Sequence, residues 1–189
     1  SKIQTELQPG YEIEKGGELE SSAKAQGSLF AYMPLAFALI ILVLVAQFDS
    51  FKRPLIILLT IPLVITGISV TLFIAPNANF SFMAILGLLA LAGIVINNAI
   101  VLIDRIEKER EDGADVRDAI LNASVTRLKP ILMTTATTVL GLLPIIIARD
   151  VLFYDLALVI SGGMIAGTVL TLGVVPVLYS LFFRQAKQG

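Results

Sequence analysis

Long apolar runs alternate with short polar segments along most of the chain. Charged residues are absent from four windows, which run from Ala25 to Phe48, Pro54 to Ile103, Pro130 to Ala148 and Leu156 to Phe183. Turn-forming residues 75–79 (Ala-Pro-Asn-Ala-Asn) divide the second window into two apolar runs. A helix of about 20 residues rises about 30 Å, the thickness of a bilayer's hydrocarbon core. The pattern therefore predicts an all-α polytopic membrane protein with about five transmembrane helices, over residues 28–48, 54–75, 81–103, 130–148 and 155–183.

A large water-soluble helical core is the alternative interpretation of these runs. Helices of such a core normally carry a polar face and rarely stay free of charge over this length. The stretch from Val64 to Phe73 is rich in Ile, Val and Thr, which also suit strands. It lacks the alternation of apolar and polar residues that is typical of a membrane β-strand, so we predict a helix there.

Composition supports lipid as the solvent and narrows the possible chemistry. The 189 residues are 56% hydrophobic, and their mean hydropathy is +0.86. The chain has no Cys and no His, which excludes disulfides, thiolate or imidazole metal sites and every catalytic pair that needs either residue. We therefore expect no enzyme, no cofactor and no metal site. A net charge of -1 gives no basic field for a nucleic acid partner.

The basic residues of the polar segments predict an orientation. If residues 1–24 lie on one side, that side holds four Lys and Arg residues and the opposite side holds ten. The positive-inside rule then places the N-terminus outside and the C-terminal residues 185–189 in the cytoplasm. Residues 1–17, with a short strand at Tyr11 to Glu14 between turn signals, are expected to end an exterior domain. The leader shows no signal-peptide pattern, so we expect a fragment of a longer polytopic protein.

The longest polar segment, residues 104–129, is interpreted as a cytoplasmic connector. Within it Val116, Ile120 and Ala123 recur at helical spacing and predict a short amphipathic helix from about Asp115 to Leu128, lying on the membrane face. A solvated connector helix of no special purpose is favoured over a partner-binding element. At the other end of the chain, a helix is expected to begin near Glu18 and to continue through Pro34 into the first span.

Two adjacent carboxamides, Asn97 and Asn98, lie deep in the third apolar run. Each needs a partner because lipid offers none, and their side chains point about 100° apart on a helix. At least one is expected to face the bundle interior. One possible role is glue between helices, worth on the order of 1 kcal/mol. The other is a polar station on an ion or proton path.

The fourth run supplies hydroxyls at Thr134, Thr135, Thr137 and Thr138. For at least half of them we expect a hydrogen bond to a carbonyl of the preceding turn. A hydroxyl can also relay a proton, because it donates and accepts at once.

Small residues in the fifth run predict close helix packing. Gly163 and Gly167 form a small-xxx-small step. No carboxylate or amine lies at mid-membrane depth, so any titrating acid for a proton cycle must belong to a part of the molecule outside this chain.

Several motifs together resemble the resistance-nodulation-division (RND) transporters, and more narrowly their hydrophobe/amphiphile multidrug efflux branch. They are residues 46–51 (AQFDSF), 93–104 (GIVINNAIVLID), 127–134 (RLKPILMT), 140–144 (LGLLP) and 175–177 (VPV). The resemblance extends from Pro9 to Val177 and so covers nearly the whole chain.

The resemblance implies the second half of a membrane domain, with residues 1–17 ending a periplasmic porter domain. It implies a proton-driven secondary transporter of the inner membrane that exports hydrophobic or amphiphilic compounds such as drugs, detergents and dyes. The implied partners are the N-terminal half and the porter domains of the same protein, further copies in a homotrimer, and, in a Gram-negative cell, a periplasmic adaptor and an outer-membrane channel.

The resemblance also assigns proton-relay residues. In the family the acids belong to the first half, and their partners in the second half are a Lys that aligns with Asn97, an Asn with Asn98 and a Thr with Thr134. Asn97 departs from this pattern, because an amide forms hydrogen bonds but carries no charge. The alternative function is a non-transporting membrane scaffold or an accessory of protein export, in which these amides only join helices.

Overall fold

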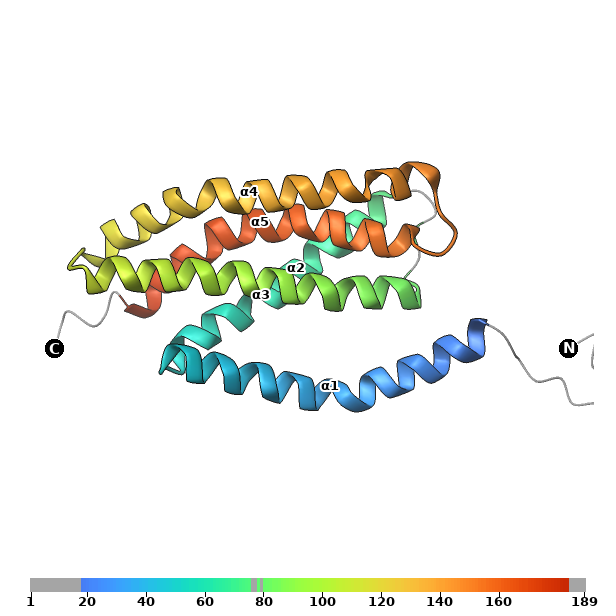
Figure 1. The fold of residues 1–189 in the computed structure, drawn as a ribbon, viewed down its shortest axis with the longest axis horizontal. Coiled ribbons are helices and arrows are strands. Elements are labelled where there is room, and N and C mark those ends of the chain that lie inside the picture. Colours follow the sequence, from blue (N-terminus) through green and yellow to red (C-terminus); the bar gives the residue numbers. More distant parts are fainter. Residues whose placement is uncertain (1–17, 76–77, 79, 184–189) are drawn as a thin grey trace, which may run out of the picture. The chain divides into compact units, whose positions relative to one another are not determined.

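The computed structural model describes residues 18–75, 78 and 80–183, and the side chains from residue 22 onward. Its helices are α1 (Glu18–Phe48), α2 (Lys52–Ile74), α3 (Phe82–Glu111), α4 (Val116–Ala148) and α5 (Tyr154–Phe183), shown in Figure 1. All five are long and apolar enough to cross a membrane. The predicted all-α polytopic fold is therefore confirmed. The predicted strand at residues 11–14 and the tail at 185–189 lie outside the described residues.

The chain divides after Leu42 into two units, and the first is described by itself. Its described part is α1 up to Leu42, which continues through Pro34 as predicted. Proline removes one backbone donor, which a transmembrane helix can tolerate where neighbouring groups satisfy the freed carbonyl.

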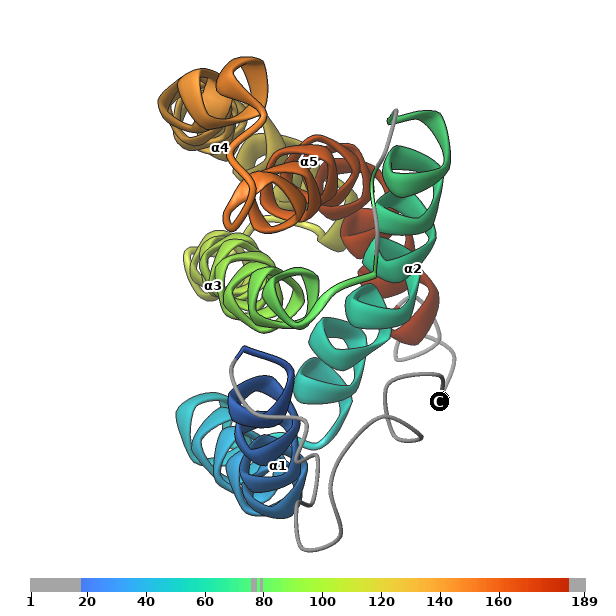
Figure 2. The same ribbon diagram turned by 90° about the vertical axis from the view of Figure 1, so that its right-hand side faces the viewer.

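In the second unit α5 is the central helix. It packs against α2, α3 and α4, and the end-on view in Figure 2 shows it among these three. The closest approaches occur at small residues. A Cβ added to Gly67 of α2 would lie 2.2 Å from the Cβ of Ala166, and one added to Gly163 would lie 2.0 Å from Cδ2 of Leu91 on α3. A Cβ on Gly167 would lie 2.9 Å from Cγ2 of Val95. Side chains larger than hydrogen would push these helices apart.

Two apolar clusters fill the space between the helices. One lies near the end where α2 begins and α3 and α5 end, and it includes Ile56, Ile103, Ile106 and Val175. The other, around Val64, Leu91 and Met164, lies toward the opposite ends of α2, α3 and α5. We call the first end of the bundle the Glu107 end, after the residue of α3 that lies there.

The predicted connector differs from the observed one. Residues 104–111 continue α3, and the expected short helix is the first part of α4, which runs unbroken through Pro130 into the fourth span. Its apolar face does not lie free on a membrane surface. Ala119 and Ala123 are fully buried in the cluster at the Glu107 end, with Val116 and Ile120 packed against it. Burial against neighbouring helices therefore stabilises this segment as the first part of one long helix.

Candidate functional site among helices α3, α4 and α5

Asn97 points away from the packed face of α3, whereas Asn98 lies at the edge of that face, seven residues after the buried Leu91. That face, with Leu91, Val95 and Ala99, is directed toward α5. Asn97 is exposed and Asn98 is half-buried. Neither side chain makes a hydrogen bond within the described part of the chain. Both amides are therefore available to a partner beyond these helices.

Thr134 also lies on an exposed surface, on α4. Its hydroxyl donates to the carbonyl oxygen of Ile131 at 2.9 Å. Thr137 likewise reaches the carbonyl of Met133 at 2.9 Å. With Thr135, which contacts the carbonyl of Ile131 at 3.0 Å, these bonds confirm that most hydroxyls of this stretch bond their own helix. The Thr134 oxygen keeps lone pairs that can still accept a proton.

A buried hydroxyl pair joins α4 to α5. The Oγ1 atoms of Thr135 and Thr168 are 2.5 Å apart, and both side chains are buried. Sequence reasoning named Thr135 without a partner and missed Thr168. Thr168 follows Met164 by four residues and Ser161 by seven, so a helical projection of α5 places it on the buried face.

Two further buried hydroxyls of α5 have no hydrogen bond. The Oγ of Ser161 and the Oγ1 of Thr171 make none within the described residues. Thr171 lies one turn after Gly167, which contacts α2 and α3. The centre of the bundle thus contains hydroxyl groups as well as apolar side chains.

A denser polar cluster occupies the Glu107 end, and the sequence analysis did not find it. The Glu107 carboxylate of α3 accepts a hydrogen bond from Arg53 of α2 at 2.7 Å and another from the hydroxyl of Tyr179 on α5. Arg53 also donates to the carbonyl oxygen of Phe48 at 2.6 Å. One carboxylate therefore connects three helices. Its spacing could have indicated this position, because Glu107 follows the buried Ile103 by four residues and so lies on the packed face of α3.

Arg110 completes this cluster. Its guanidinium donates to the Tyr179 hydroxyl at 3.0 Å and lies 3.8 Å from the Glu107 carboxylate. It also lies 5.6 Å from the ring centroid of Phe183, which stacks on Tyr179 with centroids 4.5 Å apart. One carboxylate thus lies between two guanidinium groups from different helices, and the arrangement is typical of a structural clamp.

No group of three or more metal-ligating side chains is found among the described residues. The polar groups that join or border α3, α4 and α5 are amides, hydroxyls, and a carboxylate with its arginine partners. They can accept, donate or relay protons, and they can join helices.

Comparison with known proteins identifies the family. Residues 1–183 match the model of the AcrB/AcrD/AcrF family. The chain belongs to this family of RND transporters. The resemblance recognised in the motifs is therefore confirmed at the level of the family.

Individual relatives are identical to the chain at about a third of the aligned residues. It is 37% identical over 183 residues to the swarming motility protein SwrC of Bacillus subtilis, covering 94% of the chain and 17% of that protein. It is 34% identical to the nickel-cobalt-cadmium resistance protein NccA of Alcaligenes xylosoxydans xylosoxydans, covering 98% and 17%. The cobalt-zinc-cadmium resistance protein CzcA of Cupriavidus metallidurans is also 34% identical, with 98% and 18% covered. These similarities do not distinguish the hydrophobe/amphiphile branch.

The fold is similar to that of a solved transporter. One crystal form of a heavy metal efflux pump matches with a TM-score of 0.75 and 30% identity, over 95% of this chain and 18% of that one. A second crystal form gives a TM-score of 0.72 at 29% identity. The chain thus spans less than a fifth of the length of these relatives.

Proposed function

We propose that the chain forms the second half of the membrane domain of a proton-driven secondary transporter that exports its substrate across an inner membrane. Membership of the RND family supports transport. Ten of its basic residues against four support an exterior N-terminus and a cytoplasmic Glu107 end. The partners implied by this function are the N-terminal half and porter domains of the same protein, two further copies in a trimer, and an adaptor with an outer-membrane channel where the cell has an outer membrane.

The observation that carries this proposal is the unsatisfied pair of carboxamides on α3. An amide in an apolar helix is costly when it has no hydrogen-bond partner, so its retention calls for one outside the described helices. An acid on a helix of the first half would be such a partner, since an amide can donate to a carboxylate and accept from a carboxylic acid. We infer that Asn97 and Asn98 respond to the protonation state of that acid.

Thr134 is the third member of the proposed relay. Its exposed hydroxyl donates to its own helix and can accept a hydrogen bond at the same time. The amide at position 97 cannot provide the electrostatic switch of a Lys, so the energy of coupling must come from hydrogen bonding and from the charge of the missing acid.

Two classes of substrate are supported by different observations. The motif resemblance favours hydrophobic or amphiphilic compounds, such as drugs, detergents and dyes. Similarity to NccA and CzcA, which are named as metal resistance proteins, favours divalent metal cations. We propose amphiphilic compounds as the first class and metal cations as the second. Export of dyes and of Zn²⁺, Co²⁺ and Cd²⁺ by cells that produce the full-length protein distinguishes the two.

The relay is tested in the full-length protein, reconstituted into proteoliposomes with an imposed pH gradient. Asn98→Ala and Thr134→Ala should each reduce proton-coupled transport at least tenfold, the equivalent of about 1.4 kcal/mol, with unchanged assembly by size-exclusion chromatography. Thr137→Ala is the matched control, because Thr137 is an exposed threonine one turn away whose hydroxyl is also satisfied by its own helix.

Unchanged transport in both relay variants would remove these residues from the proton path. Loss of assembly without a change of proton flux per trimer would instead support the scaffold interpretation, in which the amides only join helices.

A further inference from the structure

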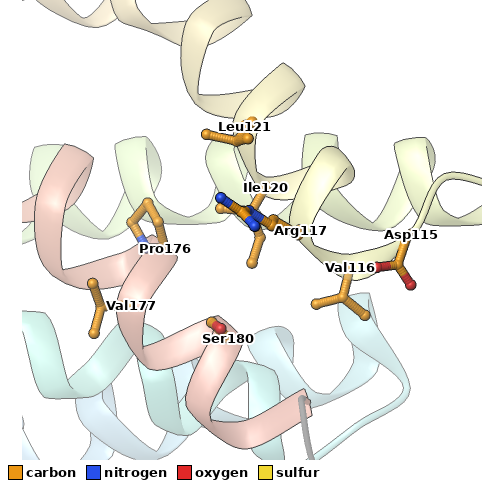
Figure 3. A pocket seen from close by; sticks show the side chains of 8 residues that line it. All are labelled: Asp115, Val116, Arg117, Ile120, Leu121, Pro176, Val177 and Ser180. Carbon is orange, nitrogen blue, oxygen red and sulfur yellow. The ribbon is translucent and has the colours of Figure 1, made fainter. Parts of the chain in front are cut away.

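Helices α4 and α5 are joined by a hydrogen bond at one level and leave a cavity between them at another. The bond links the buried hydroxyls of Thr135 and Thr168. The cavity, of about 590 Å³, opens between the first turns of α4 and the last turns of α5, and Figure 3 shows Ile120 and Pro176 among the residues that line it. Thr168 lies about 12 Å along α5 from Pro176. The hydroxyl pair thus fixes α4 against α5 at a level beyond the incompletely packed end.

The carbonyl oxygen of Ile131 connects this buried pair to the exposed Thr134. Thr134 donates to the carbonyl at 2.9 Å, and Thr135 contacts it at 3.0 Å. The Oγ1 of Thr135 also lies 2.5 Å from that of Thr168 on α5. A continuous series of hydrogen bonds therefore joins the exposed Thr134 to Thr168 on the central helix. We call this series the hydroxyl chain.

The Ile131 carbonyl cannot satisfy both hydroxyls of α4 fully. A carbonyl oxygen has two lone pairs, and in an α-helix it accepts a bond from the N–H four residues later, which here is that of Thr135. The Thr134 and Thr135 hydroxyls therefore compete for the remaining capacity of this oxygen. A stronger bond from one of them weakens the bond from the other.

The hydroxyl pair can adopt two hydrogen-bond orders, because either oxygen can donate to the other. When Thr168 donates to Thr135, the Thr135 hydrogen is directed to the Ile131 carbonyl, and the Thr134 hydrogen is released for an outside acceptor. When Thr135 donates to Thr168, the Ile131 carbonyl accepts the full bond from Thr134. The order of the buried pair thus decides whether Thr134 donates to its own helix or to a partner.

We propose that Thr168 is a positioning residue of the proton relay, which acts on Thr134 through the hydroxyl chain. With Thr168 as the donor, Thr134 can donate to the ionised acid of the first half. In the reverse order Thr134 keeps its hydrogen on Ile131 and accepts a bond from the protonated acid. No proton leaves the hydroxyl pair in either order. The inference rests on the proposed function, and it extends the relay to α5, which packs against three other helices.

The test measures transport by the full-length protein in proteoliposomes with an imposed pH gradient. Thr168→Val removes the hydroxyl and keeps the shape of the side chain. It should lower proton-coupled transport about fivefold, the effect expected from loss of one buried hydrogen bond. Thr168→Ser returns a hydroxyl to the same position and should restore transport to near the level of the unaltered protein.

Two control variants remove buried hydroxyls outside the hydroxyl chain. Ser161→Ala is matched to Thr168→Val, because Ser161 is a buried residue of α5 whose hydroxyl makes no hydrogen bond within the described residues. Thr60 of α2 is fully buried, and its hydroxyl donates to the carbonyl oxygen of Ile57 at 2.6 Å. Ser161→Ala and Thr60→Val should both leave transport unchanged.

A double variant separates positioning from packing. Thr134→Ala removes the group on which Thr168 acts, so Thr168→Val should cause no further loss of transport in that background. If Thr168 only held α4 and α5 together, Thr168→Val would lower transport by the same factor in both backgrounds.

Three results would overturn the role of Thr168. They are unchanged transport in Thr168→Val, an equal loss in Ser161→Ala, and an undiminished effect of Thr168→Val in the Thr134→Ala background. Failure of the proposed relay gives a different result, because transport is then unchanged in Thr134→Ala itself.

Discussion

Asn97 and Glu107 lie on the same helix, about 15 Å apart along its axis, but only Glu107 forms side-chain hydrogen bonds among the described residues. Glu107 accepts hydrogen bonds from two other helices and forms ion pairs with two arginines. Asn97 is exposed and has no partner among the described residues. The Glu107 end is held together by contacts among the described helices, whereas the relay proposed for the amides of α3 needs a partner from another part of the protein. Polar residues of one helix can thus serve stability at one level and function at another.

The largest effect on stability is expected at the clamp. Glu107→Ala leaves Arg53 and the Tyr179 hydroxyl without their shared acceptor and removes the ion-pair partner of Arg110 in a half-buried site, so the free energy of unfolding should fall by about 3 kcal/mol. Thermal unfolding of the full-length protein in detergent measures this loss. Glu111→Ala, a change in the exposed last residue of α3, is the control and should have little effect. Equal unfolding free energies for the two variants would contradict the clamp.

The next effect concerns close packing of helices, which the clamp helps to hold. Gly67→Ala should cost about 2 kcal/mol, because its new Cβ would lie 2.2 Å from Cβ of Ala166, a methyl group that cannot rotate away. Gly173→Ala, which meets nothing within 4 Å, should leave stability unchanged or raise it slightly. The same unfolding measurement compares the two. A neutral Gly67→Ala would show that α2 and α5 are less tightly packed than described.

A smaller effect on stability is expected at the hydroxyl pair of Thr135 and Thr168, which has one hydrogen bond between helices, where Glu107 has two and Asn97 has none. Thr135→Val removes the bond to Thr168 without changing the volume much, and should lower the free energy of unfolding by about 1 kcal/mol. A double-mutant cycle with Thr168→Val isolates the coupling between the two residues. Thr137→Val, whose hydroxyl bonds only its own helix, is the control. Additive effects in the cycle would mean that the pair contributes no interaction energy.

The smallest effect on stability is expected at Asn97. Asn97→Leu removes an amide that has no partner among the described residues, so the free energy of unfolding should change by less than about 0.5 kcal/mol. Transport should nevertheless decline if the proposed relay holds. Unfolding and transport assays on the same preparation separate the two outcomes. A large loss of stability would show that Asn97 is structural glue, and the contrast with Glu107 would then disappear.

Sequence patterns were most informative where one property decides the outcome. Segregation of charge predicted all five spans, since hydrocarbon excludes charged side chains over a length that a helix must cross. The prediction that the first helix continues through Pro34 was also confirmed. The connector was less successful. Its apolar positions 116, 120 and 123 were identified correctly, but they pack on protein where a membrane surface was expected.

The candidate site shows the same limit. Residue type and depth were enough to single out Asn97 and Asn98, because an uncharged polar group within an apolar run is visible without a structure. Thr134 was chosen among four threonines of the fourth run only through the resemblance to the family. Their partners were not visible. Thr168 bonds Thr135, which is 33 positions away in the sequence, and Glu107 bonds Tyr179, which is 72 positions away. Nothing in the local sequence around Thr168 or Glu107 indicates these partners.

The sequence by itself therefore determined that the helices suit a lipid environment, where they lie along the chain, and to which family the chain belongs. Each of these follows from local composition or from contiguous motifs. Only the tertiary structure decided which polar groups are satisfied. Hydrogen bonds and ion pairs depend on distances of about 3 Å between atoms of different helices. Those distances are set by how closely Gly67, Gly163 and Gly167 allow the helices to approach, which no single helix encodes.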